Sequence, residues 1–206
     1  MMPLLLATSN PHKIEEIAAV LEPLGIDVVG LDSLDVIPPE PVEDGNTFEA
    51  NARLKAIGYA RSTGQLCLAD DSGLEVDALG GAPGIHSARY AGLGETRDER
   101  DRANNEKLMR ELKDISEDQR SARFVCAMCL ADAKGNVLAE TRGEFPGLIT
   151  NRPSGTNGFG YDPLLYLPDV DRTSAELSPA DKNARSHRGH AARQMAEKLK
   201  EMSHKS

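Results

Sequence analysis

Short apolar runs alternate with helix-like apolar stripes over the first part of the chain. Leu4–Ala7 is continuously apolar, which is typical of a buried strand. Over 12–21 the apolar residues fall at i, i+3, i+4 and i+7, the spacing of one helical face. Asp27–Leu31 fits a second strand, and the acidic, proline-rich segment 32–46 predicts a loop. The chain is therefore predicted to begin as strand, helix and strand.

A second helix is predicted over 47–61. Its periodicity places Leu54 and Ile57 toward the core and puts Asn51 and Lys55, at i and i+4, together on another face. Lys55 can join a functional site only if the helix has this rotation.

The apolar run Leu66–Ala69 predicts a third strand, which ends at Asp70 and Asp71. The segment 97–115 predicts a largely exposed, charged helix with a thin apolar stripe. Asp70 and Asp71 follow a buried strand, and ligands gather at such strand ends in open α/β sheets.

The later part of the chain changes in pattern. Apolar segments 120–131 and 137–144 flank a Lys-Gly-Asn turn and predict a β-hairpin. A short strand at 164–167 and a last helix at 189–202 complete the pattern. We therefore predict an α/β fold with a long central mixed sheet flanked by helices, in a single domain over 1–206.

Composition narrows the function. The formal net charge of −9 argues against broad binding to nucleic acid, which needs an extended basic surface. No run approaches about 18 consecutive apolar residues, and the basic start of a signal peptide is missing. We expect a cytoplasmic protein without membrane or nucleic-acid partners. A phosphate-bearing ligand would need local cations or a metal ion in so acidic a chain.

The chain has three cysteines, Cys67, Cys126 and Cys129. The last two have CxxC spacing, which is typical of zinc or redox sites. They fall in a predicted strand, where residues i and i+3 point to opposite faces. We expect buried, structural cysteines.

The segment between the first strand and the first helix is the first candidate site. Helix starts offer unpaired N–H groups and a positive dipole end, and Thr8, Ser9 and Asn10 are natural caps there. A cation at Lys13, in the first turn, opposes the dipole unless an anion binds. The alternative is an ordinary cap followed by a solvated lysine.

Asp70 and Asp71 form the second candidate. Adjacent carboxylates repel unless one turns away or a cation lies between them, so we expect one to face a ligand and the other to fix the backbone. Hard oxygen donors favour Mg²⁺, and Glu43 or Asp44, just before a helix, offers a second carboxylate. The alternatives are an acidic turn and a helix cap.

Two further segments are candidates. Glycines on both sides of Phe159 leave its ring available to stack on a base, although such aromatics commonly pack into the core. Lys182 and the Ser-His-Arg-Gly segment 186–189 precede the last helix and can donate to a phosphate or a base. Alternatively, this is a basic helix start on the surface.

The order of these motifs resembles the inosine triphosphate pyrophosphatase family, which includes the bacterial XTP/dITP pyrophosphatases. The resemblance covers Leu4 to about Leu199 and rests on an ordered series of motifs. These are Thr8-x-Asn10-x-x-Lys13, Glu43 before a helix, Asp70-Asp71-Ser72-Gly73-Leu74, Gly81-Ala82-Pro83-Gly84 with Ser87-Ala88-Arg89, Phe159-Gly160-Tyr161-Asp162-Pro163, and Ser186-His187-Arg188-Gly189.

The resemblance implies cleavage of ITP, dITP or XTP between the α and β phosphates. It also implies Mg²⁺, a cytosolic homodimer and two lobes around a substrate cleft. By position, Asp71 matches the general base, and Asp71 with Glu43 matches the metal carboxylates. The matching substrate-binding positions are Thr8, Ser9, Asn10, Pro11, His12, Lys13, Ser72, Phe159, Gly160, Tyr161, Asp162, Lys182, His187 and Arg188.

Two other hypotheses remain at this point. One is a related pyrophosphatase that prefers pyrimidine or modified nucleotides. The other is a regulatory module that binds nucleotides without turnover, which would have no need of both Glu43 and Asp71.

Overall fold

The computed structural model describes residues 3–204. Its strands form one seven-stranded sheet in the order β2-β1-β3-β4-β5-β6-β7. The strands are β1 (Leu4–Leu6), β2 (Val28–Val29), β3 (Cys67–Val76), β4 (Ser121–Ala131), β5 (Val137–Ile149), β6 (Leu165–Leu167) and β7 (Arg172–Thr173). The α-helices are α1 (Pro11–Leu21), α2 (Phe48–Thr63), α3 (Arg97–Glu111), α4 (Pro179–Arg185) and α5 (His187–Ser203). The predicted mixed α/β architecture with flanking helices is confirmed.

The chain divides into two compact units. Unit 1 comprises Cys126–Gly143 together with the described residues up to Asp71 and from His187 onward. Unit 2 comprises Ser72–Val125 and Glu144–Ser186. Strands β3, β4 and β5 contribute residues to both units. The prediction of a single domain over 1–206 stays a prediction.

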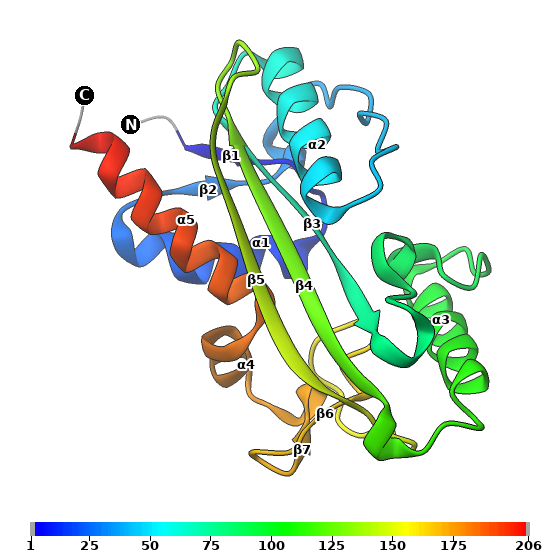
Figure 1. Cartoon of the computed structure of the whole chain (residues 1–206). Helices are drawn as coiled ribbons and strands as arrows, with labels where there is room; N and C mark the ends of the chain where they lie inside the picture. The colour runs from blue at the N-terminus through cyan, green and yellow to red at the C-terminus, as the bar shows by residue number, and fades with distance from the viewer. Residues whose placement is uncertain (1–2, 205–206) are drawn as a thin grey trace. The chain divides into compact units, whose positions relative to one another are not determined.

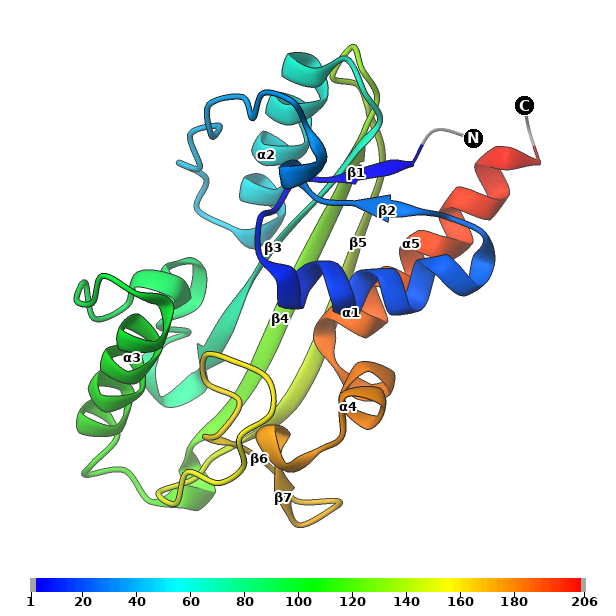
Figure 2. The ribbon, with the colours of Figure 1, turned by 180° about the vertical axis from the view of Figure 1, so that it is seen from behind.

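Unit 1 is built on parallel pairing of β1 with β2 and with β3. Helices α1 and α5 lie side by side against its sheet strands (Figures 1 and 2). Its core contains Ile17 and Leu21 of the predicted apolar stripe of α1, and Ala192 and Met195 of α5. The 3.6-residue period of both helices therefore places this core.

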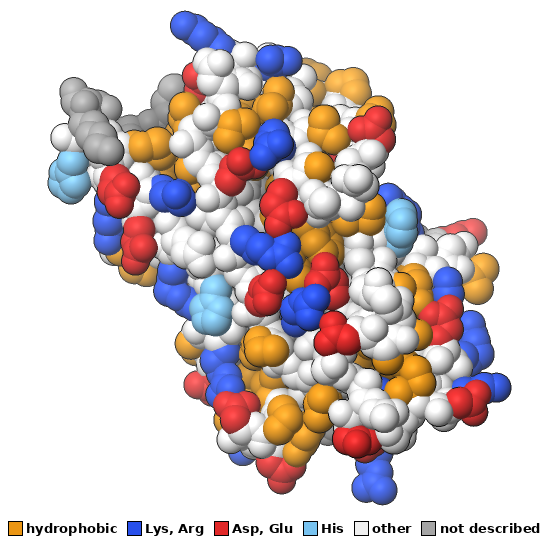
Figure 3. All heavy atoms as spheres, viewed as in Figure 1, with side chains coloured by type: hydrophobic (Ala, Val, Ile, Leu, Met, Phe, Trp, Pro, Cys, Tyr) orange, Lys and Arg blue, Asp and Glu red, His pale blue; other side chains and the backbone are white. Residues whose placement is uncertain are grey.

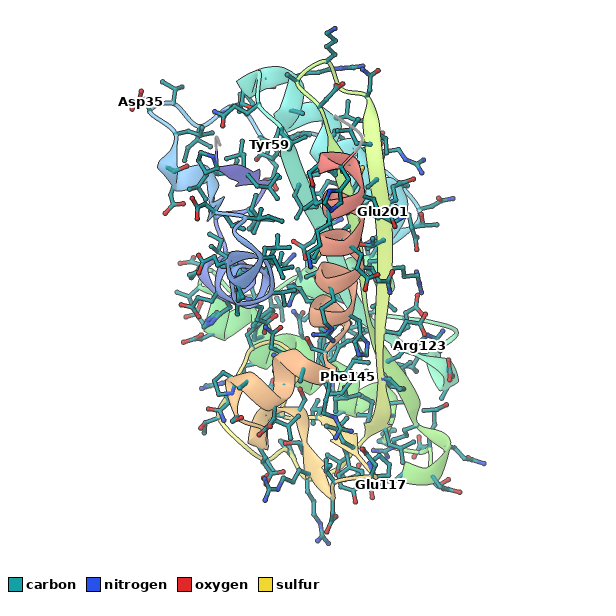
Figure 4. The ribbon with its side chains drawn as sticks, turned by 90° about the vertical axis from the view of Figure 1, so that its left-hand side faces the viewer. Asp35, Tyr59, Glu117, Arg123, Phe145 and Glu201 are labelled. Carbon is teal, nitrogen blue, oxygen red and sulfur yellow. The ribbon has the colours of Figure 1, made fainter. Side chains whose placement is uncertain are left out.

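Unit 2 has its own core. Leu108 and Leu112, from the thin apolar stripe in and after α3, pack with Leu74 and with Phe145 of β5. Figure 4 labels Phe145 and, on β4, Arg123, which pairs with Glu75 and Asp77. Antiparallel pairing joins β5 to β6 and β6 to β7.

Strand β3 is longer than predicted. It continues from Cys67 to Val76, so Asp70 and Asp71 lie within the strand and not at its end. The buried side chains of Leu74 and Val76 extend the strand past the polar residues. The prediction of a strand ending at 69 was wrong because the carboxylates interrupt the apolar pattern without interrupting the backbone ladder.

Helix α2 is rotated from the predicted orientation. Its buried face carries Phe48, Ala52, Ala56 and Tyr59, whereas Leu54 is 37% exposed. Small alanine side chains allow close packing, and burying this face stabilises the fold more than burying Leu54 would. Helix α4 and strand β7 were not predicted, and β5 extends beyond residue 144 to 149.

Within residues 3–204, no helix combines the length and apolar character needed to cross a bilayer. On the face shown in Figure 3, acidic and basic side chains are interspersed rather than gathered by sign.

Candidate functional site

The connection from β1 to α1 has the cap that the sequence predicts. The side chain of Asn10 accepts a hydrogen bond from the backbone N–H of His12 at 3.1 Å. The hydroxyl of Thr8 accepts from the N–H of Asn10, also at 3.1 Å. Pro11 is the first helical residue, and Lys13 lies in the first turn. The first turn carries no acidic residue, and the positive end of a helix dipole favours an anion.

Lys13 points to Asp70. Its ammonium lies 2.9 Å from one carboxylate oxygen of Asp70, and the Arg188 guanidinium approaches the same oxygen at 3.4 Å. Arg188 also pairs with Glu16 of α1. Asp70 and Arg188 are each only 1% exposed. This buried charge cluster joins α1, β3 and α5 within unit 1.

The two adjacent aspartates have opposite pKa shifts. Burial acts to raise the pKa of Asp70, but the charges of Lys13, Arg188 and Lys55 outweigh it and hold the pKa below its usual value. Burial also acts on Asp71, and there it prevails over Lys55 and Lys13, so the pKa of Asp71 is raised. Asp70 therefore anchors cations, whereas Asp71 has the greater proton affinity that a general base requires. The Asp70 carboxylate holds the side chains of Lys13 and Arg188, and the expectation that one aspartate fixes the backbone stays a prediction.

Asn51 holds Asp71 in place. Its side-chain amide donates to the Asp71 carboxylate at 3.1 Å, and its side-chain oxygen accepts from the backbone N–H of Gly45 at 2.9 Å. A Cβ on Gly45 would lie 2.6 Å from that oxygen, so the close approach requires glycine. One buried side chain of α2 thus connects β3 to the acidic loop before the helix.

Lys55, one turn further along α2, connects the same two segments. Its ammonium lies 3.0 Å from the carboxylate of Glu43 and donates to the backbone carbonyl of Asp70 at 3.3 Å. Burial lowers the pKa of Lys55, but Asp70, Glu43 and Asp71 together outweigh this effect and raise it. Asn51 and Lys55 therefore lie together as predicted, although α2 does not have the rotation on which that prediction depended.

In unit 2, Asp162 fixes the loop that carries Phe159. Its carboxylate accepts from the Phe159 N–H at 2.8 Å and from the Ser174 hydroxyl at 2.8 Å. The same carboxylate lies 2.6 Å from the ammonium of Lys182, and both side chains are almost fully buried. A Cβ on Gly158 would lie 2.1 Å from Asp162, so glycine is required there. Phe159 itself is half-buried.

The predicted site residues fall into two sets. Unit 1 contains Lys13, Glu43, Asp71 and Arg188, with His187 buried at the start of α5. It also holds Thr8, Ser9, Asn10, Pro11 and His12. Unit 2 brings together Phe159, Gly160, Asp162 and Lys182, and also holds Ser72 and Tyr161.

The contacts of Tyr161 and Arg188 bear on their predicted roles. Tyr161 is buried in the core of unit 2 and its hydroxyl donates to the Ser87 carbonyl at 2.8 Å. Arg188 directs its Nε to Asp70 and its Nη1 to Glu16. Their assignments as substrate-binding residues stay predictions.

Sequence reasoning missed Glu16 and Arg97. Glu16 gave no signal, because its partner Arg188 lies far away along the chain. Arg97 is the first residue of α3, where a cation opposes the helix dipole as Lys13 does in α1. The same signal could have singled it out.

The three cysteines are free and buried, as expected. Cys126 lies near Asp70, whereas Cys129 interacts electrostatically with Cys67 and Arg53, so the two CxxC sulfurs diverge. Burial raises the pKa of Cys67 and that of Cys129 to about 12. Among the described residues, no group of three or more His, Cys, Asp or Glu could hold a metal by itself.

Known proteins resemble this chain over nearly its whole length. It is 46% identical over 197 residues to the dITP/XTP pyrophosphatase of Bacillus licheniformis, covering 95% of this chain and 97% of that protein. It is 49% identical over 195 residues to the dITP/XTP pyrophosphatase of an Exiguobacterium species, covering 94% and 95%. The structure of a HAM1 protein from Coxiella burnetii matches with a TM-score of 0.86 at 39% identity, covering 98% and 100%. The sequence model of the Ham1 family matches residues 4–198, and the chain therefore belongs to the Ham1 family.

Proposed function

We propose that this protein is a nucleoside triphosphate pyrophosphohydrolase that acts on dITP, XTP and ITP. It cleaves between the α and β phosphates and releases the monophosphate and pyrophosphate, which clears non-standard purines from the nucleotide pool. The observation that carries the proposal is the grouping in unit 1 of Lys13 paired with Asp70, Lys55 paired with Glu43, and Asp71 held by Asn51. The similarity to proteins named dITP/XTP pyrophosphatase supports the substrate class.

We further propose Mg²⁺ as the cofactor, held by Glu43 and Asp71. The donors fit this ion, because Mg²⁺ takes one or two carboxylates and completes its shell with water and substrate phosphates. The Lys55 ammonium lies 3.0 Å from the Glu43 carboxylate, and Asn51 joins the Asp71 carboxylate to the backbone of Gly45, so Glu43 and Asp71 lie on segments that α2 holds beside a cation. When bound, Mg²⁺ would polarise the phosphoryl group and neutralise charge on the triphosphate.

The side chains of unit 1 supply the remaining steps. Asp71 accepts the proton of the attacking water, a task helped by its raised pKa. Lys13 and the N-terminus of α1 hold the developing negative charge on the phosphates. Asp70 keeps Lys13 in position, and Asn51 keeps Asp71 in position.

The Phe159 ring of unit 2 would stack on the purine base. Base–aromatic stacking is worth roughly 1–3 kcal/mol. A site that donates hydrogen bonds to the 6-keto oxygen would reject adenine by about 10⁴–10⁵-fold, because the 6-amino group presents the wrong polarity. Arg188 remains our candidate donor, although its Nε and Nη1 contact Asp70 and Glu16.

A panel of triphosphates tests the proposal. Pyrophosphate release is measured for dITP, XTP, ITP, dATP, dGTP, dTTP and dUTP, with and without Mg²⁺. We expect release from dITP, XTP and ITP, little release from dATP, and no release without Mg²⁺. Equal or faster release from dTTP or dUTP would favour a pyrimidine-preferring pyrophosphatase. Binding without release would favour a regulatory nucleotide-binding module.

We also propose a cytoplasmic homodimer, because the inosine triphosphate pyrophosphatase resemblance implies one. Light scattering on the purified protein tests the assembly, and a mass equal to one chain would contradict it. Fractionation of cells that express the tagged chain tests the compartment.

A further inference from the structure

The ring of Phe159 has a cationic partner on α3. The guanidinium carbon of Arg97 lies 4.4 Å from the centroid of the Phe159 ring. The Lys182 ammonium lies 5.2 Å from the same centroid, but its charge is balanced by Asp162. Cations within about 6 Å of an aromatic centroid are attracted by the ring quadrupole. Arg97 therefore packs on the side chain to which base stacking is assigned.

The loop and the helix are fastened together beside this contact. The backbone N–H of Gly160 donates to the carboxylate of Asp101 at 2.9 Å, and the Asn105 amide donates to the Gly160 carbonyl at 3.0 Å. Arg97, Asp101 and Asn105 follow one another at i, i+4 and i+8 and so share a face of α3. The peptide after Phe159 is thus held by the same helix face that carries Arg97.

Arg97 itself is held only weakly. Its Nε lies 3.8 Å from the Asp101 carboxylate, which is an ion pair but too long for a hydrogen bond. Among the described residues that Nε is buried without a hydrogen-bond partner. The first helical position also disfavours a cation, because the helix dipole is positive there. The contact with Phe159 is consequently the main feature that holds the guanidinium, and a competing planar group can replace it.

A purine is such a group. Stacked planes lie about 3.5 Å apart, so a base between the guanidinium and the ring requires roughly 7 Å, more than the distance found. Arginine planes stack on bases as well as on aromatic rings. We propose that Arg97 covers Phe159 in the absence of nucleotide and shifts to pack on the outer face of the bound base. This inference rests on the proposed function and adds Arg97 to its base-contacting residues.

The test compares Arg97→Ala with Arg102→Ala, which removes the same charge from an exposed position of the same helix. For Arg97→Ala we expect the KM for dITP to rise about tenfold with kcat unchanged, as loss of one stacking contact implies. The Kd of IMP, measured by calorimetry, should rise by a similar factor. Inhibition by tripolyphosphate, which has no base, should not change. Arg97→Lys keeps the charge but loses the plane, so it should restore only part of the affinity.

Several results would overturn the assignment. An unchanged KM for dITP means that Arg97 does not contact the base, and a lowered KM means that it acts only as a cover. An equal loss for tripolyphosphate means that its effect is one of charge or folding. If wild-type protein releases no pyrophosphate from dITP, the proposed function itself fails. Wild-type turnover with an unaffected Arg97→Ala variant contradicts the Arg97 inference alone.

Discussion

The side-chain amide of Asn51 donates to the Asp71 carboxylate at 3.1 Å, while its oxygen accepts from the backbone of Gly45 at 2.9 Å. Asn51 uses both ends of its amide group and is buried. It therefore fixes the position of Asp71 relative to the loop that carries Glu43. Buried polar groups that are satisfied in this way resist displacement, because any move leaves a partner unpaired.

Replacing Asn51 should reduce catalysis more than binding. In Asn51→Ala we expect kcat for dITP to fall by about 10–100-fold, because the carboxylate of Asp71, the proposed general base and metal ligand, loses the side chain that holds it. The Kd of IMP should stay within about twofold, since the base and sugar do not depend on Asp71. Steady-state kinetics and calorimetry measure the two effects. Ser62→Ala, an exposed change on the same helix, is the control. An unaltered kcat in Asn51→Ala would remove its positioning role.

Asp70 should stabilise the folded protein through its buried ion pairs. In Asp70→Asn the cations of Lys13 and Arg188 lose a buried counter-charge, and breaking a buried pair costs about 3–5 kcal/mol of unfolding free energy. Urea denaturation measures the loss. Glu140→Gln, which breaks an exposed pair with Arg53, should change the unfolding free energy by about 0–1 kcal/mol. Equal losses of unfolding free energy in the two variants would contradict the contribution of the buried Asp70 ion pairs to stability.

The cysteines should be unreactive in the folded protein. A pKa of about 12 for Cys67 and Cys129 lies above the ordinary value of 9.0, so the reactive thiolate forms only in strong alkali while the chain is folded. At pH 8 we expect little alkylation by iodoacetamide without urea and complete alkylation with it. Mass spectrometry identifies the modified residues. Rapid labelling of either cysteine in the folded protein would contradict its burial.

The Phe159 ring should distinguish ligands with a base from those without one. In Phe159→Ala we expect the KM for dITP to rise by about 5–100-fold, while inhibition by tripolyphosphate stays within about twofold. Phe145→Ala, in the core of unit 2, provides the contrast, because it should lower the melting temperature instead. Similar losses for dITP and tripolyphosphate would remove the stacking role of Phe159.

Much of the structure around the candidate site in unit 1 follows from local sequence. The cap at Asn10, the apolar stripe of α1 and the pairing of Asn51 with Lys55 each depend on residues close together in the chain. The orientation of α2 could not be predicted in the same way. Its buried face depends on alanines that fit closely against the rest of unit 1, whereas sequence periodicity gave more weight to the larger Leu54.

Long-range pairing is the part that the sequence did not reveal. The contact of Glu16 with Arg188 joins residues from the two ends of the chain, and no local pattern marks it. The unfavourable first-turn cation identified Lys13, and the same argument applied to α3 would have identified Arg97. Opposite pKa shifts at Asp70 and Asp71 required the structure, since they depend on burial and on cations from other elements.

Pyrophosphate release from dITP by Asp71→Asn, with saturating Mg²⁺, tests the central claim most directly. Asparagine keeps the size of the side chain but cannot accept the proton of water, so we expect kcat to fall by at least about 10²–10⁴-fold. The Kd of IMP should stay close to that of the wild type, and Asp44→Asn, an exposed neighbour of Glu43, should keep full activity. Undiminished turnover in Asp71→Asn would contradict the assignment of Asp71 as the general base.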